Sequence, residues 1–160
     1  TIIGHSERRS LLNEKELEIS KKFKIVMNSS ISPILCVGES LEERKAGSTE
    51  DVLTKQINSA FNEIDFTLYN NKTILIAYEP VWSIGTGIAA DIDIITDNIN
   101  LIKNIIKNYN LNNCNLYILY GGSVNENNAK SILSNNNLDG FLIGSASLDP
   151  NVFASIINQI

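Results

Sequence analysis

The stretch that decides the fold is Ile74-Leu75-Ile76-Ala77-Tyr78, a continuous apolar run that is followed directly by Glu79 and Pro80. Continuous rather than alternating apolar residues are expected in a parallel strand that is buried on both faces. Similar runs, each followed by a polar turn and a helical pattern, are Ile2-Ile3, Ile34-Leu35-Cys36-Val37, Leu116-Tyr117-Ile118-Leu119-Tyr120 and Phe141-Leu142-Ile143. Five consecutive strand–helix units predict an α/β protein with a parallel sheet, either doubly wound or closed into a barrel.

The segments between these runs carry helix signals. Expected N-terminal caps are Asn13 with Glu16, Ser40 with Glu43, Asn125, and Asp149 before Pro150. Apolar stripes at helical spacing are Leu53, Ile57, Ala60, Phe61 and Ile64; Ile95, Ile99, Ile102 and Ile106; and Phe153, Ile156, Ile157 and Ile160. No linker-like stretch separates these units, so residues 1–160 are predicted to form a single domain.

Composition limits the partners that this chain can have. Its net charge of −5, without a basic cluster, argues against nucleic acid. No segment has the roughly 18 consecutive apolar residues of a membrane span. The only histidine is His5, and Cys36 and Cys114 have no ligand or disulfide spacing, so neither a metal site nor a disulfide framework is predicted. A reducing compartment is therefore the default.

Two candidate acid–base groups follow strands at their carboxyl ends, where βα proteins place reactive residues. His5 begins a helical turn, and the positive end of a helix favours the neutral imidazole. Glu79 ends the most apolar run, and desolvation there raises the pKa of a carboxyl toward that of a useful general base. Taken singly, each residue also fits a structural role, His5 as a satisfied histidine and Glu79 as a carboxylate paired with a lysine or arginine.

Glycine-rich segments at the same edge predict a ligand site. A loop with proline at its start, glycines at its end and apolar residues between predicts a lid that excludes water, although a tucked-in loop with a buried tryptophan is the alternative. This loop comprises Pro80, Val81, Trp82, Ser83, Ile84, Gly85, Thr86 and Gly87. After the last two strands, Gly121-Gly122-Ser123 and Gly144-Ser145 let backbone N–H groups approach a phosphate closely, as in the phosphate site of (β/α)8 barrels.

Four stretches, in order and spacing, resemble the triosephosphate isomerase family, namely residues 4–9, 78–87, 120–124 and 139–144. The resemblance spans essentially the whole chain, and isomerases of other phosphosugars fit these motifs less well. It implies a TIM (β/α)8 barrel of which this chain supplies five βα units, strands four to eight, so that residues 1–160 form a partial barrel without the N-terminal three units. It also implies an isomerase of glycolysis and gluconeogenesis that interconverts dihydroxyacetone phosphate and D-glyceraldehyde 3-phosphate through an enediolate, without a cofactor or metal.

The resemblance assigns roles to individual residues. Glu79 corresponds to the base that removes a proton beside the carbonyl, and His5 to the neutral electrophile that polarises the carbonyl. Cys36 corresponds to a packed cysteine near the base. The family's phosphate-binding positions correspond to Gly85, Ser123, Gly144 and Ser145, its supporting residues to Ser6 and Glu7, and its closing loop to residues 80–87.

Two departures from the family pattern are expected to have small effects: Ser145 stands where a glycine is usual, and Ile88 where a basic residue usually follows the lid. The larger departure is that the family's strand-one Asn and Lys and its long dimer loop have no counterpart here. The alternative to an isomerase is therefore a catalytically silent barrel fragment that binds phosphate or complements a missing N-terminal segment. As partners the family implies a phosphorylated triose and a second copy in a homodimer. It implies a cytoplasmic location, or a plastid one if a transit peptide lies upstream.

Overall fold

The computed structural model describes residues 1–85, 89–134 and 137–159 of this chain. Within them lie five parallel strands, β1 (Ile2–Ile3), β2 (Ile34–Val37), β3 (Thr73–Tyr78), β4 (Asn115–Tyr120) and β5 (Gly140–Phe141). They pair in chain order, β1-β2-β3-β4-β5. A doubly wound sheet reverses its strand order at a switch point. The unreversed order is instead that of an arc of a barrel, so the predicted α/β class and barrel-type order are confirmed.

The register brings the carboxyl ends of the central strands to one edge. Val37, Tyr78 and Tyr120 stand side by side at the ends of β2, β3 and β4. The ladder continues one residue further, because the Glu79 N–H donates to Val37 O at 2.8 Å. Glycine is required at Gly38, where a Cβ atom would lie 1.8 Å from the Glu79 carbonyl oxygen. This close approach places whatever follows β2 directly beside whatever follows β3.

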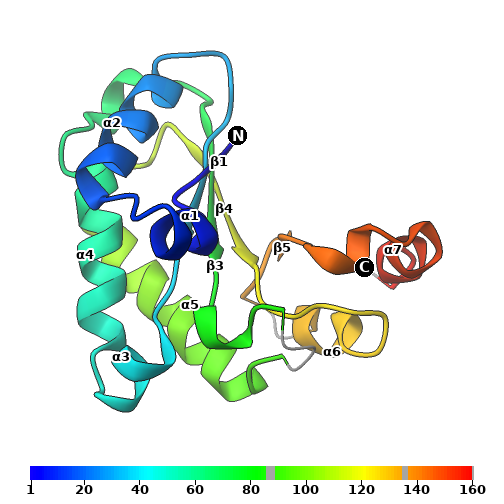
Figure 1. The fold of residues 1–160 in the computed structure, drawn as a ribbon. Coiled ribbons are helices and arrows are strands. Elements are labelled where there is room, and N and C mark those ends of the chain that lie inside the picture. Colours follow the sequence, from blue (N-terminus) through cyan, green and yellow to red (C-terminus); the bar gives the residue numbers. More distant parts are fainter. Residues whose placement is uncertain (86–88, 135–136, 160) are drawn as a thin grey trace.

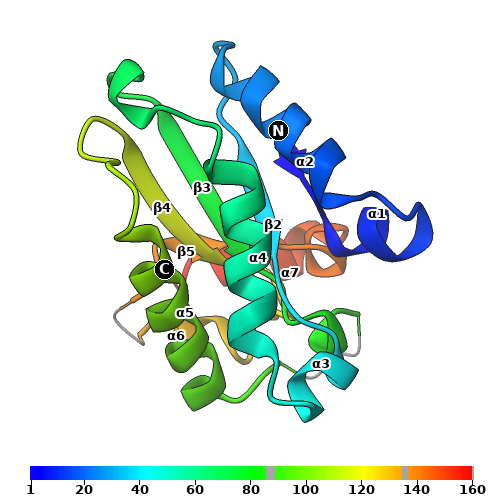
Figure 2. The same ribbon diagram turned by 90° about the vertical axis from the view of Figure 1, so that its left-hand side faces the viewer.

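Three long helices cover one face of the sheet. They are α2 (Glu16–Met27), α4 (Thr49–Phe61) and α5 (Ile92–Ile106), and they lie together on one side of the strands in Figure 1 and in front of them in Figure 2. Alternate strand residues, among them Leu35, Ile74 and Ile76, point to these helices and are fully buried. The shorter helices are α1 (Ser6–Leu11), α3 (Leu41–Lys45), α6 (Ala129–Leu133) and α7 (Pro150–Ile157), with 3-10 turns η1 (Phe66–Leu68), η2 (Val81–Ser83) and η3 (Ser145–Ser147).

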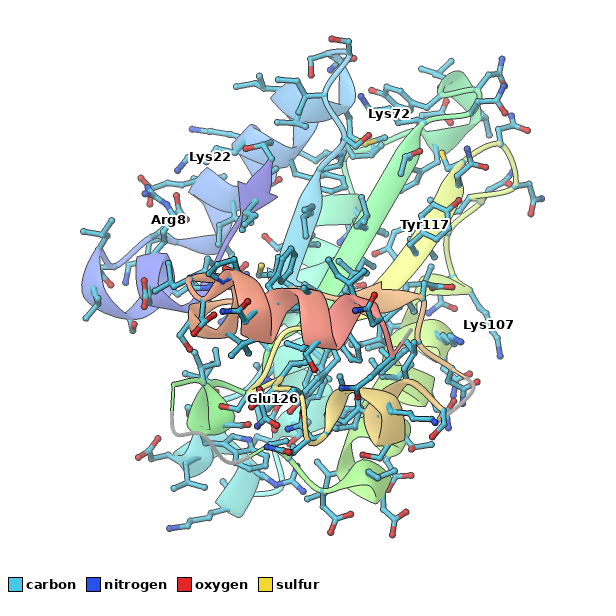
Figure 3. The ribbon with its side chains drawn as sticks, turned by 90° about the vertical axis from the view of Figure 1, so that its right-hand side faces the viewer. Arg8, Lys22, Lys72, Lys107, Tyr117 and Glu126 are labelled. Atoms are coloured by element: carbon cyan, nitrogen blue, oxygen red, sulfur yellow. The ribbon has the colours of Figure 1, made fainter. Side chains whose placement is uncertain are left out.

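The opposite face of the sheet has a smaller apolar cluster of its own. Cys36, Ala77 and Leu119 are buried there. Helix α7 crosses in front of the carboxyl halves of the strands, as Figure 3 shows. Beyond it, Ile2 and Tyr117 remain 48% and 43% exposed. The same strands are therefore fully covered on one face and partly covered on the other.

One predicted helix cap is wrong. Asn13 does not cap α2; it adopts a left-handed φ of +54° in the turn between α1 and α2. The helix begins at Glu16, after Lys15, whose backbone N–H is capped by the Glu18 carboxylate at 2.9 Å. At Asn13 the spacing was correct for a cap, but the chain uses the residue to turn instead. Asn125 does cap the turn that leads into α6: its Oδ1 accepts from the Asn127 N–H at 2.9 Å and its carbonyl oxygen accepts from the Ala129 N–H at 3.0 Å, although α6 itself begins at Ala129.

Other local predictions are confirmed, although some elements are shorter than predicted. Ser40 and Glu43 form a reciprocal capping box, but helix α3 ends at Lys45 and the buried stripe belongs to the separate helix α4. Asp149 caps α7 as predicted, accepting from two backbone N–H groups. Strand β5 stops at Phe141. The last predicted stripe packs poorly, because Phe153 and Ile157 are exposed and Ile156 is the buried member; Ile160 lies outside the described residues.

Candidate active site

A cavity of about 630 Å³ lies at the carboxyl edge of the sheet, between the residues that follow β1, β3, β4 and β5 and the start of α7. That volume falls within the usual range for small-molecule sites. The predicted site residues that line it are His5, Glu7, Glu79, Ile84, Gly85, Ser123, Gly144 and Ser145. The fold thus brings together residues from the two ends of the chain.

The two candidate acid–base groups contact each other in this cavity. Nε2 of His5 lies 3.1 Å from Oε1 of Glu79. The histidine side chain is 30% exposed, whereas the glutamate side chain is 3% exposed. A partly open donor and a nearly buried carboxylate therefore face the same space.

The hydrogen bonds of His5 determine which ring nitrogen carries the proton. His5 is the N-cap of α1, and its Nδ1 accepts from the Glu7 N–H at 3.4 Å. An accepting Nδ1 cannot carry a proton, so the proton of the neutral ring is on Nε2, the nitrogen that faces Glu79. The local capping geometry thus directs the Nε2–H donor of the ring toward Glu79.

The environment of Glu79 raises its pKa. Burial is the largest cause, and it is offset only in part by interaction with His5, by hydrogen bonds from Ser6 and Cys36, and by the more distant charge of Arg9. The Ser6 N–H donates to Glu79 Oε2 at 3.0 Å and holds the carboxylate in place. A carboxylate with a raised pKa is a stronger base, which is what proton abstraction requires.

Small and inert neighbours leave room for this carboxylate. A Cβ atom at Gly121 would lie 3.0 Å from Cγ of Glu79, so a side chain at that position would press on the glutamate. Cys36 is fully buried, and burial followed by the Glu79 charge raises the pKa of its thiol strongly. The thiol therefore stays protonated, and Cys36 is a packing residue, as the sequence predicts.

The loop after Glu79 is anchored on several sides. Nε1 of Trp82, in η2, donates to Oε1 of Glu39 at 3.0 Å. The Ser123 hydroxyl donates to the Ser83 carbonyl oxygen at 2.6 Å and ties η2 to the segment after β4. Gly85 has a left-handed φ of +69°, which favours glycine. Pro80, Val81, Trp82 and Ser83 do not line the cavity; Thr86, Gly87 and the departure at Ile88 lie outside the described residues.

The two predicted phosphate-binding turns face the cavity without a cationic side chain. Ser123 and Gly144 line it from different strands, and Ser145 begins η3. Among the lining residues that the structure describes there is no lysine or arginine. An anion would here rely on backbone N–H groups, which is the mode of binding that the acidic composition predicts.

Three residues near this site were not singled out as functional by the sequence. Glu39 holds Trp82, Tyr78 donates to Glu39, and Tyr120 accepts from the Ala90 N–H at 3.1 Å. Glu39 follows a strand end just as Glu79 does, so its position was the available signal. The two tyrosines end apolar strands and could not be distinguished from core residues.

Other kinds of site are not found in the part of the chain that the structure describes. No group of three or more His, Cys, Asp or Glu side chains there could hold a metal ion. None of the helices described is both long and apolar enough to cross a membrane.

Fold and site together define an α/β protein of barrel type with an acid–base pair at the carboxyl edge of its sheet. The sequence model of the triosephosphate isomerase family matches residues 1–160. The triosephosphate isomerase of Buchnera aphidicola is 48% identical over 98% of this chain, and those of Francisella philomiragia and Paracoccidioides lutzii are each 42% identical over 99% of it. The chain belongs to the triosephosphate isomerase family. It spans 61–63% of the length of these curated relatives.

Proposed function

We propose that this chain is the C-terminal portion, strands four to eight, of an isomerase that interconverts dihydroxyacetone phosphate and D-glyceraldehyde 3-phosphate, and that residues 1–160 form a single partial-barrel domain. The observation that carries this proposal is the contact of 3.1 Å between Nε2 of His5 and the buried carboxylate of Glu79. Family membership supports the same activity.

In the proposed reaction the two groups act on adjacent atoms of the substrate. The ionised Glu79 takes a proton from the carbon beside the carbonyl, and the His5 Nε2–H donates a hydrogen bond to the carbonyl oxygen as it gains negative charge. The His5 ring then moves a proton from the hydroxyl oxygen of the enediolate to the former carbonyl oxygen, and Glu79 returns its proton to the neighbouring carbon, which gives the other triose. This pairing is the established one for triosephosphate isomerases. Because the donor and the base contact each other, the substrate must enter between them.

The remaining predicted residues have supporting roles in this proposal. Backbone N–H groups of Gly85, Ser123, Gly144 and Ser145 bind the phosphate, and the lid of residues 80–87 excludes water from the enediolate. Ser6 positions Glu79 and Glu7 positions His5, through the hydrogen bonds described above. The family's strand-one Lys, which this chain does not contain, would supply the positive charge that the described lining lacks.

The proposal is tested by turnover of D-glyceraldehyde 3-phosphate, coupled to reduction of dihydroxyacetone phosphate, with solvent deuterium incorporation as a second readout of proton abstraction. The 160-residue chain is assayed alone and after co-folding with the N-terminal part of the Buchnera aphidicola relative. We expect Glu79→Gln to lower turnover about 10³-fold, the usual size of general acid–base effects. Glu63→Gln, at an exposed carboxylate, is the matched control. Equal turnover in all three proteins would contradict the proposal.

A second candidate function, a catalytically silent fragment that binds phosphate or complements an N-terminal segment, is supported by two observations. The partly covered sheet face, with Ile2 and Tyr117 exposed, and the lack of a described cation in the cavity both leave the site incomplete. This candidate is favoured if the folded chain alone binds inorganic phosphate without turnover, and turnover appears on co-folding.

We also propose that the protein forms a homodimer and acts in a reducing compartment such as the cytosol. Leu11 and Leu12, at the end of α1 beside Glu7 and Arg8, are strongly exposed, which supports a contact between copies there. Two free cysteines are consistent with a reducing compartment.

A further inference from the structure

Asn98 is a polar residue on the apolar face of helix α5. Its neighbours on that face, Ile95, Ile99 and Ile102, are buried isoleucines, and Asn98 itself is only 7% exposed. A buried amide is costly unless it is hydrogen-bonded, and an apolar side chain would pack at this place without that cost. The hydrogen bond that Asn98 makes is therefore what explains a polar residue at this buried position.

That hydrogen bond goes to the hydroxyl of Tyr78. Nδ2 of Asn98 donates to Oη of Tyr78 at 2.8 Å. A tyrosine hydroxyl has one proton, and with Asn98 donating to the oxygen the proton is directed elsewhere. It points to Glu39, whose two carboxylate oxygens lie 3.2 and 3.1 Å from Oη. Asn98 thus sets the orientation of the Tyr78 hydroxyl.

Glu39 connects the Tyr78 hydroxyl to η2. Its side chain is fully buried, and its Oε1 also accepts from Trp82 Nε1 at 3.0 Å. The guanidinium of Arg44 lies 3.5 Å from the same oxygen and 5.2 Å from the centre of the Trp82 ring. Arg44 therefore contacts both partners of the Glu39–Trp82 hydrogen bond. The Glu39 carbonyl oxygen accepts from the Val81 N–H at 3.1 Å. Side chain and backbone of one residue therefore both hold η2.

We infer that Asn98 is a positioning residue: by orienting the Tyr78 hydroxyl toward Glu39, it holds Trp82, and with it η2, against the end of β2. The chain of contacts joins α5 to the first turn after Glu79 without touching the cavity. Its consequence for catalysis, that Asn98 sets how firmly the start of the predicted lid is anchored, rests on the proposed function. The positional inference itself does not.

Trp82 is the sole tryptophan of the sequence, so its fluorescence reports on this anchor directly. The test compares acrylamide quenching of the 160-residue chain and its Asn98→Leu variant, a change of similar size that removes the donor. We expect the released population of Trp82 to rise about fivefold, the factor that corresponds to one net hydrogen bond. Ile102→Val, at a buried position on the same helix face, is the control and should leave quenching unchanged.

Tyr78→Phe distinguishes an effect through the hydroxyl from a packing defect. This variant should raise quenching as much as Asn98→Leu does, and the double variant should raise it no further, because both substitutions break the same chain of contacts. Additive effects, or an Asn98→Leu variant that quenches like Ile102→Val while Tyr78→Phe does not, would overturn the inference. Circular dichroism confirms that each variant is folded.

These measurements need neither substrate nor turnover. If the proposed isomerase activity fails while Asn98→Leu releases Trp82, the positional inference stands by itself. If turnover is present and Trp82 is unaffected by Asn98→Leu, the inference fails and the proposed function is untouched.

Discussion

Glu39 and Glu79 follow neighbouring strands, lie at the same edge of the sheet and are almost equally buried, at 0% and 2% exposure. Their surroundings differ. Glu39 is turned away from the cavity and faces Tyr78, Trp82 and Arg44, which between them offer hydroxyl, indole and guanidinium donors. Glu79 lines the cavity and has the Ser6 N–H and His5 as its nearest partners.

The comparison shows that burial alone does not decide what a carboxylate does. A buried carboxylate enclosed by donors and a cation is a fixed structural acceptor, whereas one with an open side can still reach a ligand. Glu14 is a third case. It is buried in the turn before α2. Its Oε2 lies 3.1 Å from Nε of Arg8, and its other oxygen contacts the Lys22 ammonium. Burial is the largest influence on Glu14 and acts to raise its pKa, but the two cations together outweigh it, and the pKa is lowered.

The strongest test of this comparison applies the same change to both glutamates. Glu39→Gln places an amide N–H₂ among donors and leaves some of them unpaired, so we expect a loss of about 2 kcal/mol in the free energy of unfolding. Glu79→Gln removes a buried charge that burial disfavours, as the raised pKa of Glu79 indicates, and should leave that free energy equal or higher. Urea unfolding at pH 7, followed by circular dichroism, measures both. Equal losses would mean that the different surroundings of the two carboxylates do not distinguish the two sites.

A second test uses pH. Because the pKa of Glu79 is raised above its ordinary value of 4.5, the folded protein holds this proton more tightly than the unfolded chain does. The resulting stabilisation is complete below pH 4.5 and is lost as the pH rises through the raised pKa. Wild-type protein should therefore lose stability relative to Glu79→Gln over that interval. A difference that stays constant with pH would contradict the direction of the shift.

The smallest expected effect is at Glu14. Its lowered pKa gives stability that is present above pH 4.5 and lost as the pH falls through the lowered value. Glu14→Gln should cost about 1 kcal/mol at pH 7, because Arg8 and Lys22 are both nearly half exposed and screened by solvent. The cost should disappear in acid. Unfolding curves of Glu14→Gln and wild type are compared at neutral and acidic pH. If the comparison is correct, the advantage of the wild type over Glu14→Gln grows with rising pH, whereas its stability relative to Glu79→Gln falls.

Much of the candidate site could be predicted from the sequence because it consists of residues that follow strands. Continuous apolar runs identify buried parallel strands, and the carboxyl ends of such strands meet at one edge. Once the strands are predicted correctly, His5, Glu79 and Ser123 are therefore expected to lie near one another. The caps show where local pattern fails: Asn13 has cap spacing but adopts a left-handed turn, because the path of the chain between α1 and α2 requires one.

The sequence by itself determined the order of the elements, the parallel sheet and the membership of the site, since each depends on local apolar pattern and on strand ends. Only the tertiary structure decided how the two strand-end glutamates differ in their surroundings. Glu39 faces donors on three separate segments, Tyr78 at the end of β3, Trp82 in η2 and Arg44 in α3, whereas Glu79 faces the cavity and His5. The behaviour of a buried carboxylate depends on the donors, charges and open space around it, and no spacing along the chain specifies these surroundings.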